Sequence, residues 1–194
     1  MTVDTPSTSS TAEVIAGVTA EVITEVTGER ADLLAELAQS RYFLRLTTQG
    51  LTDEQARMRT TASALCLGGL IKHVSQVEKG WVDFILNGTS AMKNFADMTE
   101  EDYAAREAEF ELLPGETLAE VLETYEEVAR RTDEVVATLP DLGVAHLLPE
   151  APWFQPGVRW SARRVLIHIV GETAQHAGHA DIIRESLDGA KSMG

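Results

Sequence analysis

Residues 163–189 read RRVLIHIVGETAQHAGHADIIRESLDG and hold three of the five histidines in the chain. Apolar residues recur in this stretch at helical spacing, and Gly189 follows as a residue type that ends helices. Ser161, just before the stretch, is a residue type that caps helix N-termini. The sequence therefore predicts a long helix from Ser161 to about Leu187.

The polar residues of this helix share one side of it. At about 100° per residue, His168, Glu172, His176 and His179 fall within a sector of roughly 80°, which also holds Val165. The opposite side carries the charged residues Arg163, Asp181, Glu185 and Asp188. We therefore expect the histidines and the glutamate to follow the apolar stripe and to point into the protein.

An ionised carboxylate in that position costs several kcal/mol unless something compensates its charge, and a divalent cation does so well. Glu172 and His176 are one helical turn apart, so both can reach one ion. A third ligand must come from another helix. His73 lies on the apolar stripe of a second predicted helix, whereas His146 lies in a proline-rich segment. His73, Glu172 and His176 would form a site with open positions, suited to zinc or Fe(II).

Each of these residues also has a simpler interpretation. The buried set can be a hydrogen-bonded network without a metal. His168 is expected either as a hydrogen-bonding partner behind the ligands or as a core histidine. His179 either lines the pocket or makes a contact near the helix end. Arg41, on the apolar stripe of the first predicted helix, either binds a substrate carboxylate or pairs with an acid such as Glu78.

The rest of the chain predicts an all-α protein with a four-helix bundle. Long connections join the second helix to the third and the third to the fourth. The four predicted helices cover about residues 29–50, 67–86, 117–140 and 161–187, with one short helix near 99–109. The predicted organisation is a partly disordered N-terminal extension over 1–27, the bundle over 28–190 and a short tail over 191–194.

Composition limits the function classes. The net charge of −15 argues against nucleic acid and against an anionic membrane surface, since both require clustered lysine and arginine. No apolar run approaches the ~20 residues that span a bilayer. The single cysteine, Cys66, is expected to be a small buried residue, and a cytoplasmic setting is the simplest expectation.

Two stretches, GGLIKHVSQVEKGW at 68–81 and the one quoted first, resemble the DinB-like superfamily. They are most similar to the branch that contains mycothiol-dependent maleylpyruvate isomerase and related actinobacterial proteins, over about residues 28–190. The resemblance implies His73, Glu172 and His176 as metal ligands. Gly171 and Arg164 depart from the pattern of that branch and leave the substrate open.

The resemblance further implies a divalent-metal-dependent S-transferase or isomerase that uses a mycothiol-like thiol. A metal-bound thiolate would attack a small electrophile, with zinc as the first expectation and nickel, iron or manganese as alternatives. Glu172 and His179 would take catalytic roles, and Arg41 and His168 would help to bind the cosubstrate. The alternative is a non-catalytic metal-binding bundle in stress response or sensing. A monomer and a homodimer are both compatible with the acidic composition.

Overall fold

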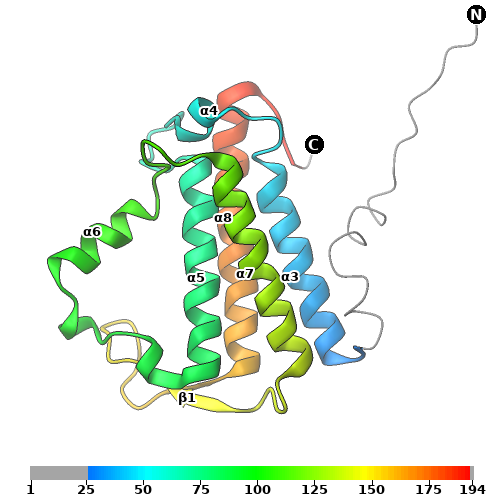
Figure 1. The fold of residues 1–194 in the computed structure, drawn as a ribbon, viewed down its shortest axis with the longest axis vertical. Coiled ribbons are helices and arrows are strands. Elements are labelled where there is room, and N and C mark those ends of the chain that lie inside the picture. Colours follow the sequence, from blue (N-terminus) through cyan, green and yellow to red (C-terminus); the bar gives the residue numbers. More distant parts are fainter. Residues whose placement is uncertain (1–25, 193–194) are drawn as a thin grey trace, which may run out of the picture.

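The computed structural model describes residues 26–192, and in that part of the chain four long helices lie side by side (Figure 1). The long helices are α3 (Glu29–Leu46), α5 (Leu67–Asn87), α7 (Leu118–Thr138) and α8 (Ala162–Asp188). The shorter elements are α4 (Asp53–Arg57), η1 (Gly88–Ala91), η2 (Phe95–Asp97), α6 (Glu100–Ala108), β1 (Ala145–Leu147) and β2 (Arg159–Ser161). The helical class is as predicted, whereas almost all of the predicted extension lies outside the described residues.

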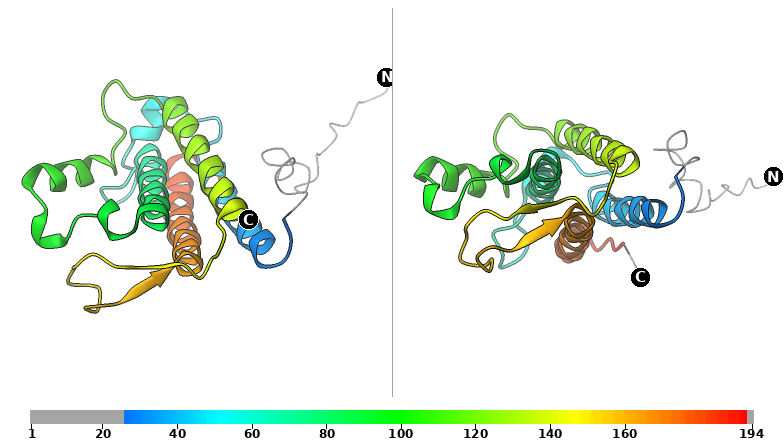
Figure 2. Two further views of the ribbon diagram at one scale, coloured as in Figure 1. Left: turned by 60° about the horizontal axis from the view of Figure 1, so that its bottom comes forward. Right: turned by 90° about the horizontal axis from the view of Figure 1, so that it is seen from below.

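The long helices differ in direction and in how closely they pack. Helices α3 and α8 run one way, and α5 and α7 run the other way (Figure 1). Seen from below, they surround a common centre, with α6 outside α5 (Figure 2). Helix α8 packs extensively against α3 and α5, and α5 against α7, whereas α3 and α7 touch over much less of their length. The seam between α3 and α7 is therefore the loosest of the four.

Local capping explains where the helices begin. Thr52 and Thr117 form capping boxes with Gln55 and Glu120, in which side chain and backbone N–H groups are satisfied reciprocally. The Ser161 side chain accepts a hydrogen bond from the backbone of α8. The structure confirms the cap that the sequence predicts at Ser161, and Thr52 and Thr117 carry the same kind of local signal in the sequence.

The core consists of two apolar clusters with an ionic group between them. Along α3, Leu37 belongs to one cluster and Leu44 to the other, and the buried Arg41 lies between them. The Arg41 guanidinium donates to Glu78 Oε1 at 2.5 Å and to Asp133 Oδ1 at 2.8 Å. These two acids lie on α5 and α7, so one arginine connects three helices. The predicted pairing of Arg41 with Glu78 is confirmed.

The connection between α7 and α8 is more regular than the sequence suggests. The prolines of residues 140–159 predict a structured loop rather than a helix, and within this connection β1 pairs antiparallel with β2, with Ala145 opposite Ser161. The strands are only three residues long and are separated by prolines, so they leave no alternating pattern to recognise. None of the described helices is long and apolar enough to cross a membrane.

The segment after α6 packs tightly on the start of α5. A Cβ atom on Gly69 would lie 1.9 Å from the carbonyl oxygen of Phe110, so only glycine allows this approach. Cys66 is buried beside it; its thiol accepts a hydrogen bond from the Gly69 N–H at 3.4 Å and contacts the Phe110 carbonyl at 3.7 Å. The contact holds residues 109–112 against α5.

Gly69→Ala should therefore destabilise the protein by about 1–3 kcal/mol, because the added methyl group must displace the Phe110 backbone. The matched control is Gly80→Ala, in the same helix, where nothing lies within 4 Å of the added Cβ. That variant should be neutral or up to about 1 kcal/mol more stable, because alanine favours the helix. Urea unfolding measures the free energy of unfolding of both variants. Equal changes in Gly69→Ala and Gly80→Ala would contradict the tight contact between Gly69 and Phe110.

Candidate metal centre

Three side chains from two helices meet on the α5–α8 seam. His73 comes from α5, and Glu172 and His176 come from α8. One potential ligand atom from each lies within 4.8 Å of those of the other two. The structure thus brings together the three residues that the sequence analysis selected, and α8 supplies the pair that is one turn apart.

The α8 residues lie at the margin of its buried face rather than at the centre. The Glu172 side chain is 31% exposed and that of His176 is 12% exposed. The centre of the buried face runs through Ala162, Leu166, Ile169, Thr173, Ala177 and Ala180. The apolar pattern of the larger side chains predicts a more buried position for the histidines and Glu172, because that pattern leaves out the small residues alanine and threonine. One side of the candidate centre is therefore accessible to small molecules.

Glu172 has imidazoles on both sides. Its Oε1 is 3.9 Å from His168 Nε2, and its Oε2 is 3.7 Å from His176 Nε2. Neither contact is a hydrogen bond, and within residues 26–192 no lysine or arginine lies within salt-bridge distance of this carboxylate. Glu172 is consequently an anion without a close cation, which is what a metal ion would provide.

His73 is held from behind by residues that the sequence analysis did not select. Its Nδ1 lies 3.3 Å from Glu109 Oε2, and its ring stacks on Phe110 with centroids 3.9 Å apart. The Glu109 contact leaves Nε2 as the free nitrogen of His73. A carboxylate behind a ligating histidine fixes the tautomer and the ring orientation. No local pattern marks Glu109, because its distance from His73 depends on the path of the long connection.

The remaining histidines of α8 flank the three candidate ligands. His168 packs edge-on against Trp81 and Trp160, with centroid distances of 5.0 and 5.1 Å, while the two tryptophan rings stack on each other. His179 Nδ1 is 3.5 Å from His176 Nδ1, so His179 stands on the far side of His176 from Glu172. Burial lowers the pKa of both His168 and His176, and the nearby His73 lowers that of His176 further. His176 is thus favoured in the neutral form that a metal ligand requires.

Arg41 lies apart from this centre, in the ionic group described above. Burial alone would lower its pKa, but Glu78 and Asp133 outweigh burial and raise it. Its predicted role in binding a substrate carboxylate stays a prediction.

His146 also lies outside the candidate centre. Its Nε2 contacts the Ile85 carbonyl at 3.1 Å, so this side chain anchors the β1 strand to α5.

The donor set fits a divalent ion. Zinc binds nitrogen and oxygen at about 2.0–2.2 Å, which puts tetrahedral ligand atoms about 3.4 Å apart. Since the three atoms lie within 4.8 Å of one another, side-chain rotations that bring them closer by up to about 1.4 Å would satisfy this geometry. Two neutral nitrogens and one carboxylate leave a net positive charge and at least one open position.

The fold and the site define an all-α protein with a candidate two-histidine, one-glutamate metal centre between two helices. The family model for mycothiol-S-transferase matches residues 32–189, and the chain belongs to this family. A comparison with curated proteins found no match.

Glu109→Gln should weaken zinc binding by roughly 10-fold or more, because the amide holds the His73 ring less strongly than the carboxylate does. Competition with a chromophoric chelator measures the affinity. Glu107→Gln, an exposed glutamate on α6, is the matched control and should bind zinc as the unaltered protein does. Equal affinities for both variants would show that Glu109 does not support the centre.

Proposed function

We propose that this protein is a divalent-metal-dependent S-transferase that joins a low-molecular-weight thiol of the mycothiol type to a small electrophile. The observation that carries the proposal is the convergence of His73, Glu172 and His176 on an accessible seam, in a chain of the mycothiol-S-transferase family. Zinc is the proposed ion, and the bundle is proposed to be of the DinB-like type.

The bound ion would lower the pKa of a coordinated thiol and so supply a thiolate at neutral pH. His73 and His176 contribute neutral nitrogens, and Glu172 contributes a single negative charge, so the centre keeps a net positive charge. In this proposal Glu109 orients His73 through its contact with Nδ1, and His168 flanks the Glu172 carboxylate without a hydrogen bond. Both act on neighbouring side chains and are positioning residues.

The proposed reaction is a substitution or an addition at carbon. The S–H bond breaks, and the proton passes to water or to His179. A bond forms between sulfur and the electrophilic carbon, and a leaving group, where there is one, departs with the electron pair. An isomerisation would use the same adduct and then break the new C–S bond. The partly exposed seam at Glu172 gives both substrates a route to the ion.

The test is a conjugation assay with zinc-loaded protein, mycothiol and 1-chloro-2,4-dinitrobenzene, followed by the absorbance of the thioether. Glu172→Ala should lose roughly 100-fold or more of the enzyme-dependent rate, because it loses the metal that stabilises the thiolate. Gln175→Ala, on the exposed side of the same helix, should keep the rate within about twofold.

Two further outcomes test whether the protein is catalytic and which class of thiol it uses. Zinc-loaded protein that consumes no electrophile with any thiol would sink the catalytic proposal and favour a sensing or storage role. Glutathione in place of mycothiol tests the thiol class, and an equal rate with both would contradict the mycothiol assignment.

A further inference from the structure

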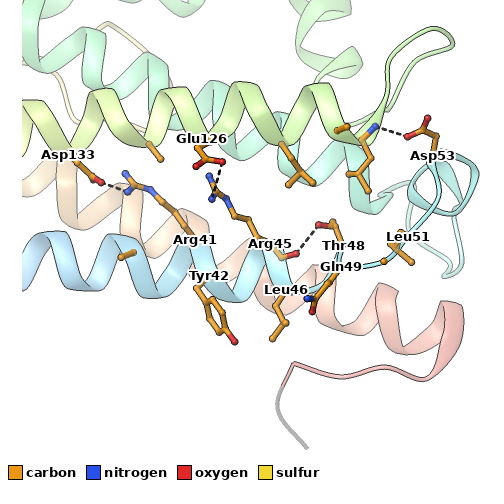
Figure 3. Close-up of a pocket in the computed structure, with 16 residues that line it drawn as sticks. Arg41, Tyr42, Arg45, Leu46, Thr48, Gln49, Leu51, Asp53, Glu126 and Asp133 are labelled. Atoms are coloured by element: carbon orange, nitrogen blue, oxygen red, sulfur yellow. Dashed lines mark hydrogen bonds and ion pairs between the residues drawn. The ribbon is translucent and has the colours of Figure 1, made fainter. Parts of the chain in front are cut away.

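A cavity lies on the other side of the protein from the candidate metal centre. It has a volume of about 760 Å³ and opens between α3, α7 and the loop that follows α3 (Figure 3). Leu46, Leu51, Leu118 and Leu122 give it an apolar lining at the end near α4. The metal-centre residues belong to α5 and α8, so the two sites share no residue. The volume is in the range of small-molecule sites, which is roughly 300–1,000 Å³.

Arg45 lines the polar part of this cavity, and its one ion pair, with Glu126, is long (Figure 3). Its Nη1 is 4.0 Å from Glu126 Oε2, which is beyond hydrogen-bond distance. Its Nε and Nη2 atoms are buried and have no hydrogen-bond partner among the described residues. The guanidinium carbon lies 5.2 Å from the centre of the Tyr125 ring, a contact that supports the charge only in part. A cation in this position attracts an anionic ligand.

The other charged groups of the cavity already have partners. Asp133 accepts from Arg41, and Asp53 accepts from the Leu118 N–H at 2.8 Å (Figure 3). Glu126 has a side chain that is 59% exposed, so it can turn to solvent at little cost. Among the charged side chains of the cavity in the described part of the chain, Arg45 is therefore the one with buried polar atoms that lack a hydrogen-bond partner.

We propose that this cavity is a binding site for a small apolar carboxylic acid. The carboxylate pairs with Arg45 and displaces Glu126, and the hydrocarbon part lies against Leu51, Leu118 and Leu122. Charge and lining together select this chemistry. An alcohol supplies no charge to pair with Arg45, and an amine is repelled by it. A doubly charged phosphate brings a second negative charge that Arg45 alone does not neutralise. The site takes its ligand without a covalent step and without the metal.

The test uses the full-length protein treated with a chelator, so that a carboxylate cannot bind a metal ion. Isothermal titration calorimetry compares octanoate, octanol and octylamine. We expect octanoate to bind at least about tenfold more tightly than octanol. The carboxylate of octanoate offers Arg45 a charged acceptor, whereas the hydroxyl of octanol is neutral. Octylamine should not bind. Equal binding of octanoate and octanol, or no binding of octanoate, would overturn the proposal.

Variants locate the site. Arg45→Met keeps the length of the apolar stem and should weaken octanoate binding at least about tenfold while leaving octanol binding unchanged. Glu126→Gln removes the competing carboxylate and should tighten octanoate binding, an outcome that a misfolded variant could not produce. Arg130→Met, on the outer side of α7, is the control and should bind octanoate normally. Octanoate binding that neither Arg45→Met nor Glu126→Gln alters would overturn the assignment to this cavity.

Discussion

Arg41 places a positive charge in the middle of the protein, between a carboxylate of α5 and a carboxylate of α7. Burying such a group without its partners costs several kcal/mol, so the three helices are held at the one register that brings Glu78 and Asp133 to the guanidinium. The apolar clusters on either side tolerate small slips, because dispersion contacts are not directional. The ionic group does not tolerate a slip of one turn. It therefore fixes which residues of α3, α5 and α7 face one another.

The position of the cavity follows from that register, and the position of the candidate metal centre follows from the packing of α8 on α3 and α5. Helix α8 packs against α3 and α5, which puts the Glu172–His176 pair opposite His73 on the α5–α8 seam. The α3–α7 seam is held by the Arg41–Asp133 pair and by Arg30, which donates to the Val136 and Leu139 carbonyls. On the other side of Asp133 the seam opens into the cavity at Arg45. One seam thus carries imidazoles around a carboxylate that no lysine or arginine of the described residues pairs. The other carries a cation with one long ion pair beside apolar side chains.

The sequence predicts the long helices well because their caps and their spacing are local. Thr52, Thr117 and Ser161 mark helix starts through their own backbone contacts, and the His73, Glu172 and His176 set follows from spacing and resemblance. Distances that depend on the path of a long connection cannot be predicted in this way. Glu109 reaches His73 only because residues 109–112 pack on Gly69, and Asp133 joins Arg41 only after α7 is placed.

The depth of the site was also misjudged from the sequence, for a physical reason. Alanine and threonine on α8 are small enough to let α5 approach, so the buried face of the helix is centred on them, and the histidines lie at its edge. A centre at the edge can exchange ligands with solvent, which a buried network cannot do. The catalytic proposal depends on this difference.

The most direct test of the account is the zinc stoichiometry of the purified chain, measured by native mass spectrometry on metal-free protein supplied with zinc. The account predicts about one ion per chain in the unaltered protein and in His146→Ala, which alters a histidine outside the centre. It predicts loss of that ion in His73→Ala, with the helical circular dichroism retained. Equal zinc content in His73→Ala and the unaltered protein would contradict a centre shared between α5 and α8.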